Sequence, residues 1–217
     1  MSRSFEPRTI WGTGGNFPTL ESTAPPPRPQ LFVKNTHSVI GDDESLHLSG
    51  DIAQRVVCEG ELAIVIGTEC RRLTSADEAR AVIAGYTVAN DVTARDLQDV
   101  DAHWSRAKGL DGFCPLGAGL VAPVDAPDWD EAIIRTRVDG QTIQHTPVSA
   151  AFVGAEELVV WASQQFTLHP GDVFLLGTPD YLPPGREDAA VLRPGSVVEI
   201  DIAGIGSLRT PVRGDSG

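Results

Sequence analysis

Basic residues are few for a chain of 217 residues. Lysine and arginine total 17, whereas aspartate and glutamate total 30, so the formal net charge is −13. A general nucleic-acid binder needs cationic side chains to displace the counterions of the phosphates, so the charge argues against that class. It does not argue against a small anionic ligand, because a bound metal ion can reverse the local field.

Cysteines are also scarce, and long apolar runs are missing. The three cysteines, Cys58, Cys70 and Cys114, lack C-x-x-C spacing, which argues against a disulfide framework or a zinc knuckle and predicts buried, reduced thiols. No apolar stretch approaches the ~20 residues that cross a bilayer, and residues 1–9 lack the apolar core of a signal peptide. We therefore expect a cytoplasmic protein whose partners include neither a membrane nor a nucleic acid.

The first thirty residues differ in composition from the rest. Gly12, Gly14 and Gly15 lie in a glycine-rich turn region, and a cluster of prolines occupies residues 25–29. Proline lacks an amide donor and fixes φ, so this piece is not expected to form a regular helix or a central strand. We predict that residues 1–30 form a small lid segment with a Pro-rich linker, and that residues 31–217 form the domain that carries the chemistry.

Short strands dominate the pattern after residue 31. An apolar run at residues 62–66 that ends at Gly67 predicts a buried strand, and residues 86–91 predict a second. Residues 133–144 predict a hairpin, because the Asp139-Gly140 pair in their middle suits a type I′ turn.

Two longer segments predict helices. Ser75, followed by Glu78 three residues later, predicts a helix that begins at a capping box and ends near Gly85. Apolar residues with helical spacing predict a second helix over residues 150–166. Many short strands and only two long helices predict a mostly β fold of the α+β class.

Three carboxylates are the best candidates for a chemical site. Glu59 and Glu61 stand at the start of the first apolar strand, where residues two apart share a face, and Asp91 ends the second strand. Anions held this close repel each other unless they are protonated or bridged by a cation. Oxygen ligands favour a hard cation such as Mg²⁺, Mn²⁺ or Ca²⁺. From the spacing alone, two solvated glutamates at an edge strand remain an alternative.

Four segments, in the same order along the chain, resemble the fumarylacetoacetate hydrolase superfamily. They are residues 59–67, 85–98, 104–117 and 168–179. The resemblance implies a rolled β-sheet core with flanking helices, and a homodimer. It also implies that Glu59, Glu61 and Asp91 bind Mg²⁺ or Mn²⁺, with Ca²⁺ possible in their place. The expected substrate is a small anionic 2-oxo or 2-enol carboxylate.

The same resemblance implies roles for residues around the carboxylates. Lys108 matches a lysine that reaches the substrate, where its charge can stabilise an oxyanion. Gln98 matches a position that hydrogen-bonds the substrate, and Gly177 with Thr178 matches a carboxylate-binding turn. Two further expectations are structural: an ion pair between Arg95 and its neighbour Asp96, and a structural or rim position for Lys34.

One motif of the superfamily is broken. Its hydrolases carry a histidine and a glutamate near the N-terminus that together activate water, and here Leu20 and Thr23 occupy those positions. Glu21 is nearby but lies two residues short. A leucine cannot transfer a proton, so hydrolysis of a C–C bond lacks its usual base. His103, five residues before Lys108, is the candidate substitute catalytic base.

The sequence therefore favours a divalent-metal-dependent isomerase or tautomerase. The substrate would be a small 2-hydroxydienoate or 2-oxo dicarboxylate, converted through a metal-stabilised enolate. Residues 111–115 and 175–179 also resemble the 2-hydroxyhepta-2,4-diene-1,7-dioate isomerase branch of the superfamily. Two alternatives stay open: an acylpyruvate-type C–C hydrolase or 2-oxo acid decarboxylase, and a non-catalytic relic that only binds metal and ligand.

Overall fold

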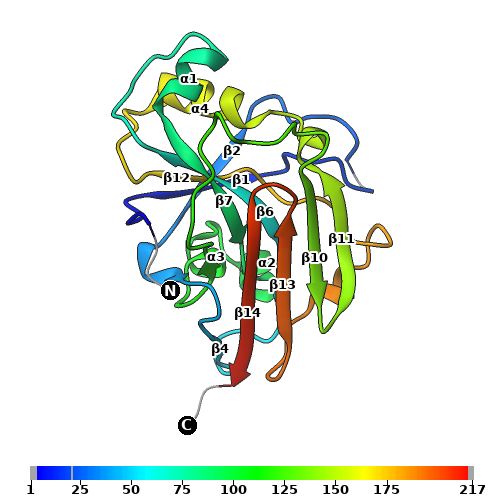
Figure 1. The fold of residues 1–217 in the computed structure, drawn as a ribbon. Helices are drawn as coiled ribbons and strands as arrows, with labels where there is room; N and C mark the ends of the chain where they lie inside the picture. Colours follow the sequence, from blue (N-terminus) through cyan, green and yellow to red (C-terminus); the bar gives the residue numbers. More distant parts are fainter. Residues whose placement is uncertain (1–3, 21, 215–217) are drawn as a thin grey trace.

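Two five-stranded sheets form the body of the chain in the computed structural model, which describes residues 4–20 and 22–214 (Figure 1). The first sheet has the order β2-β1-β12-β6-β7. Its strands are β2 (Gln30–Lys34), β1 (Ile10–Gly14), β12 (Val173–Leu175), β6 (Gly60–Ile66) and β7 (Ile83–Asn90). The pair β1–β12 is parallel, and the other pairs of this sheet are antiparallel.

The second sheet has the order β11-β10-β13-β14-β4. Its strands are β11 (Gln141–Pro147), β10 (Ile133–Val138), β13 (Val197–Ile202), β14 (Gly206–Gly214) and β4 (Leu46–Leu48). Two small strand pairs complete the β structure: β3 (Val39–Ile40) with β9 (Cys114–Pro115), and β5 (Val56–Val57) with β8 (Thr93–Ala94). The predicted mostly β, α+β class is confirmed.

Strand β6 is buried along its whole length because it is covered on both faces. Leu62 and Ile64 belong to the large core that also includes β10 and β13, whereas Ala63 and Val65 face a smaller apolar cluster on the other side. Gly60 points toward the second sheet, where an added Cβ would lie 2.1 Å from Thr136 Oγ1. The close approach of the sheets therefore requires glycine at this position.

The helices are short and flank the sheets. They are α1 (Ala76–Val82), α2 (Arg95–Val100), α3 (Ser105–Lys108) and α4 (Ala155–Gln165), with 3-10 turns at Thr36–Ser38, Val148–Ala150 and Glu187–Ala190. Helices α1 and α4 pack against each other at one end of the molecule (Figure 1). Among the residues that the structure describes, no helix has the length and apolarity that a bilayer crossing requires.

The two helix predictions hold with shorter bounds. Ser75 caps α1 by accepting a hydrogen bond from the Glu78 amide at 3.2 Å. This helix stops at Val82 because β7 begins at the next residue. The second predicted helix begins only at Ala155, since the residues before it form a 3-10 turn and an irregular bend.

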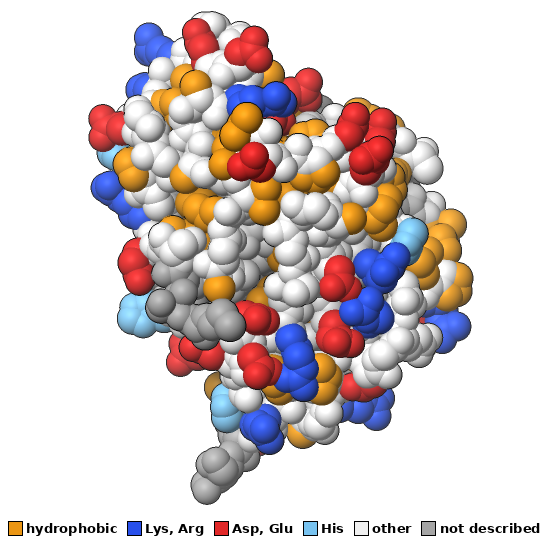
Figure 2. All heavy atoms as spheres, in the orientation of Figure 1, with side chains coloured by type: hydrophobic (Ala, Val, Ile, Leu, Met, Phe, Trp, Pro, Cys, Tyr) orange, Lys and Arg blue, Asp and Glu red, His pale blue; other side chains and the backbone are white. Residues whose placement is uncertain are grey.

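The predicted hairpin is present as β10 and β11. Asp139 has a φ of 52° and Gly140 a φ of 79°, the pair of positive values that a type I′ turn requires. Its sheet presents charge to solvent. Arg137 on β10 contacts Glu199 at 3.5 Å and Asp201 at 2.7 Å on β13. Figure 2 shows acidic and basic side chains interspersed over this face of the molecule.

The predicted lid segment is wrong for residues 10–17. Residues Ile10–Gly14 form β1, which is paired with strands on both sides inside the first sheet. Asn16 and Phe17 are buried, and Asn16 Nδ2 donates to the Leu176 carbonyl at 2.8 Å. The glycines do not disrupt the strand, because Phe32 on β2 fills the space beside Gly12. A lid made of residues 18–29 remains a prediction.

Candidate metal and substrate site

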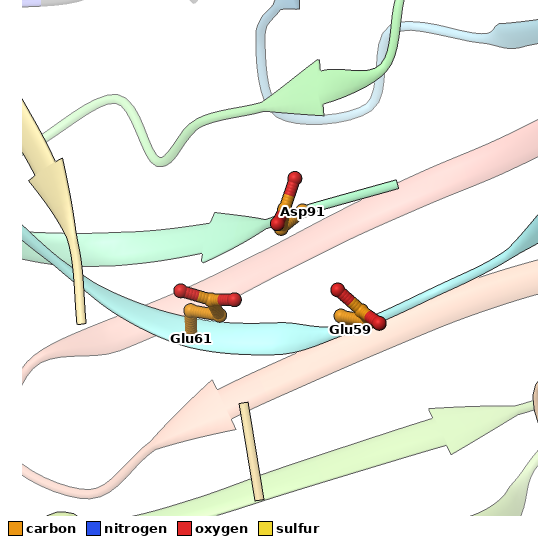
Figure 3. A group of neighbouring side chains, drawn as sticks. All are labelled: Glu59, Glu61 and Asp91. Atoms are coloured by element: carbon orange, nitrogen blue, oxygen red, sulfur yellow. The ribbon is translucent and has the colours of Figure 1, made fainter. Parts of the chain in front are cut away.

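Three buried carboxylates converge at the open ends of β6 and β7 (Figure 3). Gly60 faces the second sheet, so strand alternation turns Glu59 and Glu61 to the opposite side. Asp91 follows the last residue of β7, and its amide donates to the Glu59 carbonyl at 2.9 Å. One carboxylate oxygen from each residue lies within 4.8 Å of those of the other two. The predicted convergence of these side chains is confirmed.

Three cationic side chains contact the carboxylates. Lys108 Nζ lies 2.7 Å from Glu59 Oε2 and 2.6 Å from Asp91 Oδ2. Lys34 Nζ lies 2.5 Å from Asp91 Oδ1, and Arg95 Nη2 lies 2.5 Å from Glu59 Oε1. The formal charges of these six groups sum to zero, so the cluster is electrostatically balanced although it is buried.

The contacts separate the protonation behaviour of the two glutamates. Burial alone would raise the pKa of Glu59, but the positive charges of Lys108 and Arg95 lower it to about 2. Burial and the charges of Asp91 and Glu59 raise the pKa of Glu61 well above its ordinary value. Burial lowers the pKa of Lys108, but Asp91 and Glu59 outweigh it, so that pKa is raised and the side chain stays cationic.

The carboxylates fit a hard divalent cation. All donors are carboxylate oxygens, which Mg²⁺, Mn²⁺ and Ca²⁺ prefer, and no thiol or imidazole belongs to the cluster. Glu61 meets the negative charges of its neighbours, and its Oε2 accepts only one hydrogen bond in the described chain, from the Gly177 amide at 2.7 Å. A cation among the three oxygens would remove this repulsion, so the residues present fit a metal ion.

A cavity of about 180 Å³ opens beside the three carboxylates, and we call it the carboxylate cavity. Its lining includes all three carboxylates and the residues Lys108, Gln98, Trp104, Phe32, Arg95, Thr13 and Thr178. The Lys108 ammonium lies 5.0 Å from the centre of the Phe32 ring. A larger, mostly apolar cavity of about 410 Å³ near Ile52 and Phe113 shares no lining residue with it, so we assign the site by its chemistry.

The structure brings most of the predicted substrate residues to this cavity. Gln98 lines it, and its Oε1 accepts a hydrogen bond from Arg95 Nη1 at 2.7 Å. The Thr178 hydroxyl lines it as well, and donates to the Gly60 carbonyl at 3.1 Å. Gly177, at a φ of 103°, turns its amide to Glu61, so in this structure it holds a carboxylate of the protein.

His103 lies outside the cavity. It is exposed in the turn between α2 and α3, whereas Trp104 and Lys108 line the cavity. His103 precedes the first residue of α3, so the helix does not fix the direction of its side chain, which is exposed to solvent. The described residues that line the carboxylate cavity and the cavity next to it include no histidine.

Lys34, the last residue of β2, is 1% exposed and pairs with Asp91, so of its two expected positions it takes the structural one and not the rim. The expected pairing of Arg95 needs correction. Arg95 does not pair with Asp96; it contacts Glu59 and, through Nε, Glu187 Oε2 at 2.8 Å. The carboxylate of Asp96 instead accepts from the Gln54 amide at 2.8 Å.

Thr13 is a cavity residue that sequence reasoning missed. Its side chain is buried, it lines the carboxylate cavity, and its hydroxyl has no hydrogen-bond partner within the described chain. The hydroxyl is nevertheless not exposed to the cavity: Gly12 and Gly14 face Phe32 and Trp104, so strand alternation turns the Thr13 side chain to the opposite face of the sheet. A single threonine in a glycine-rich segment has no distinctive pattern, so sequence reasoning did not single it out.

The structure shows where Leu20 and Thr23 lie, the residues at the positions of the water-activating histidine and glutamate. Leu20 is 70% exposed, and its amide donates to Asp180 Oδ2 at 2.9 Å. Thr23 is exposed as well, and Glu21 lies outside the described residues. The segment that carries the histidine and glutamate in hydrolases of the resembled superfamily therefore presents an apolar and a hydroxyl side chain here.

The fold is of the α+β class, and its three buried carboxylates, which fit a divalent cation, lie beside a lysine-lined cavity. The family is shown by comparison with known proteins. A model of the fumarylacetoacetate (FAA) hydrolase C-terminal family matches residues 9–213, and the chain belongs to this family. The resemblance drawn from the four sequence segments is therefore confirmed.

Relatives with assigned activities include isomerases and a hydrolase. The crystal structure of 5-carboxymethyl-2-hydroxymuconate delta-isomerase from Mycobacterium smegmatis has a TM-score of 0.86 at 37% identity, covering 98% of this chain and 81% of that one. A mitochondrial oxaloacetate tautomerase of Xenopus laevis is 37% identical over 89% of this chain and 61% of its own length. A 2,4-didehydro-3-deoxy-L-rhamnonate hydrolase of a Sphingomonas species is 33% identical over 89% and 68%.

Proposed function

We propose that the protein is a divalent-metal-dependent tautomerase or isomerase of a small 2-oxo or 2-enol dicarboxylate. The observation that carries this proposal is the composition of the carboxylate cavity. It combines three carboxylates that fit a hard cation with a buried lysine, and its described lining has no histidine. The proposal also rests on the relatives with isomerase and tautomerase activities.

The metal ion would be Mg²⁺ or Mn²⁺, held by Glu59, Glu61 and Asp91. When bound, such an ion supplies Lewis acidity, which polarises a substrate carbonyl and stabilises the negative charge of an enolate. The carboxylates are positioned for this by two backbone contacts, from Gly177 to Glu61 and from Asp91 to Glu59.

The protein side chains hold and orient the substrate. Lys108 is a buried cation on the cavity wall, so its ammonium can pair with a substrate carboxylate or with the oxygen that gains charge on enolisation. The hydroxyl of Thr178 and the amide of Gln98 offer neutral hydrogen bonds around the same space. Phe32 and Trp104 form an aromatic wall, with ring centres 5.4 Å apart, which limits the access of water.

Tautomer exchange requires less of this cavity than hydrolysis does. Moving a proton between carbon and oxygen needs a stabilised enolate, whereas cleaving a C–C bond with water also needs a base to deprotonate the water. Such a base contributes about 10²–10⁴-fold. Leu20 replaces the histidine of the family's hydrolases, and His103 is exposed outside the cavity.

A C–C hydrolase is the second candidate, favoured by the similarity to the Sphingomonas hydrolase. A non-catalytic relic is disfavoured, because the chain keeps all three carboxylates and the buried Lys108 around one cavity.

The experiment that tests the proposal follows two products from one substrate. Freshly dissolved enol-oxaloacetate is mixed with the protein and Mg²⁺, the loss of enol absorbance reports tautomerisation, and a coupled assay for pyruvate reports cleavage. We expect metal-dependent loss of the enol signal to outpace pyruvate formation. Hydrolysis of an acylpyruvate with kcat/KM of about 10⁴ M⁻¹s⁻¹ or more would overturn the proposal in favour of the hydrolase, and release of pyruvate from oxaloacetate at that efficiency would overturn it in favour of a decarboxylase.

A further inference from the structure

A second cavity continues from the carboxylate cavity toward solvent, and we call it the adjoining cavity. It has a volume of about 430 Å³. Thr19, Arg95 and Thr178 line both cavities, so the two meet at these residues. A ligand anchored at the three carboxylates and longer than the inner cavity would extend into the adjoining one.

Two arginines face this second cavity, and one of them also reaches the metal carboxylates. Arg95 contacts Glu59 through Nη2 at 2.5 Å and Glu187 through Nε at 2.8 Å. The other oxygen of Glu187 contacts Nη2 of Arg55. The Glu187 carboxylate therefore bridges both guanidinium groups at the junction of the two cavities.

Glu187 is held there only by contacts that another carboxylate can reproduce. Its side chain is 24% exposed, that of Arg95 is 19% exposed and that of Arg55 is 52% exposed, so water and solutes reach the bridge. Ion pairs at such partly exposed positions contribute little net stability, because solvation of the separated groups nearly compensates for the contact. A ligand carboxylate that binds both arginines in place of Glu187 therefore replaces one weak ion pair with a similar one, at little cost in free energy.

The other charged groups near the bridge leave the arginines available. Asp180 also lines the adjoining cavity, but its Oδ2 accepts the Leu20 amide at 2.9 Å and its Oδ1 accepts the Tyr181 amide at 2.8 Å. Asp99 lies 3.9 Å from Arg55, at the limit of an ion pair. The backbone after the Glu187–Ala190 turn is fixed by a hydrogen bond from the Leu192 amide to the Val56 carbonyl, at 2.8 Å, so rotation of the Glu187 side chain suffices for its release.

We propose that Arg55 and Arg95 form a second anion subsite at the junction of the cavities, that Glu187 occupies it in the ligand-free chain, and that a carboxylate at the far end of the substrate displaces Glu187. This inference rests on the proposed function for the near end of the substrate. It assigns selection of the far end to Arg55, and it makes Glu187 an internal competitor that weakens binding of every substrate with a second carboxylate.

Matched pairs of 2-oxo acids test the subsite by direct binding. 2-Oxoglutarate and 2-oxovalerate differ only at the far end, which is a carboxylate in one and a methyl group in the other, and 2-oxoadipate with 2-oxohexanoate extends the reach. Isothermal titration of each acid into the Mn²⁺-loaded protein gives its Kd, with no dependence on turnover. We expect each diacid to bind the unmodified protein more tightly than its methyl counterpart.

Glu187→Gln keeps the shape and removes the competing charge. We expect it to tighten binding of the diacids by about threefold, the size of a partly exposed ion pair, and to leave the methyl acids unchanged. Arg55→Gln should remove the preference for diacids. Glu199→Gln is the matched control, because Glu199 also contacts an arginine, Arg137, but lines neither cavity. Thermal melts establish that each variant is folded.

The outcomes separate the two proposals. Binding of all four acids without preference for the diacids would overturn the subsite and leave the proposed function standing. An equal change for diacids and methyl acids in Glu187→Gln would also overturn it, because Glu187 would then act only by positioning Arg95. Absence of binding by all four acids would overturn the proposed function, and the subsite with it.

Discussion

Glu61 is the carboxylate of the site that no lysine or arginine touches in the described structure. Its Oε2 accepts the Gly177 amide, while Glu59 and Asp91 each contact cations and add their negative charge to its surroundings. The side chain is therefore the one that gains most from a bound cation. A substitution of Glu61 can therefore remove the charge without unfolding the protein.

We expect Glu61→Gln to weaken Mn²⁺ binding by at least the ~10–100-fold that changes to outer-shell partners of metal ligands cost. The fold should persist, because glutamine keeps the shape and removes a charge that its neighbours repel. Isothermal titration with Mn²⁺ measures the affinity, and a thermal melt of the metal-free variant measures stability. Unchanged Mn²⁺ affinity would remove Glu61 from the metal site.

Thr13 carries a buried hydroxyl that has no hydrogen-bond partner in the described chain. We expect Thr13→Val to leave the free energy of unfolding equal or higher, because the methyl group keeps the shape and a costly unpartnered polar group is gone. Urea denaturation measures the change. A clear loss of stability would show that the hydroxyl has a partner in the folded protein.

Helix α1 depends on its N-terminal hydrogen bonds more than on its length, which is only seven residues. Ser75 accepts from the Glu78 amide, and the Glu78 carboxylate accepts from the amide and hydroxyl of Thr74 at 2.6 and 3.0 Å. We expect Ser75→Ala to lower the free energy of unfolding by about 1 kcal/mol, measured by urea denaturation. Ser149→Ala is a control serine outside this cap, and a similar loss there would contradict the assignment.

The same cap predicts a pH dependence. The hydrogen bonds from Thr74, opposed only weakly by burial, lower the pKa of Glu78 from 4.5. A carboxyl with a lowered pKa in the folded state stabilises the fold above its unfolded pKa, and this contribution is lost as pH falls through the folded value. The difference in stability between the unmodified protein and Glu78→Gln should therefore shrink below about pH 4.5. A difference that stays constant with pH would contradict this.

The elements that sequence reasoning predicted are those with a local signal. The apolar run of β6, the Ser75 cap and the Asp139-Gly140 turn each fix their structure within a few residues, and each is present. Strand β1 was missed because its glycines are favourable only next to Phe32 of β2, a contact that the isolated segment does not reveal. Nonlocal packing decided that element.

The residues of the site also divide into those that a local sequence pattern predicts and those that only the folded structure brings together. The spacing of Glu59 and Glu61 on one strand made their common orientation predictable, the end of the second predicted strand added Asp91, and the resemblance to the family added Lys108. The Arg95–Glu187 contact joins residues 92 positions apart, so no local pattern indicates it. His103 was misplaced because its distance from Lys108 in sequence does not determine where a side chain in the turn before α3 points.

At the scale of the whole molecule, the proposed function makes the reaction type depend on whether the segment around Leu20 supplies a base. We expect Leu20→His with Thr23→Glu to raise the ratio of acylpyruvate hydrolysis to oxaloacetate tautomerisation, toward the about 10²–10⁴-fold that a positioned base contributes. Both positions are exposed, so stability should change little. Val124→His is the control, because it places a histidine at another exposed position, outside both cavities. An unchanged ratio would mean that other groups set the reaction type.

The balance of three cations against three carboxylates also affects the stability of the protein without a metal ion. A zinc finger unfolds without its metal, whereas here the acidic cluster is already neutralised by Lys34, Lys108 and Arg95. Treatment with a chelator should therefore leave a cooperative thermal melt, and an ion at 100 times its Kd should add about 2.7 kcal/mol by mass action alone. Under the proposed function, folding is then independent of metal supply, and protein that has folded without the ion becomes active when the ion is supplied.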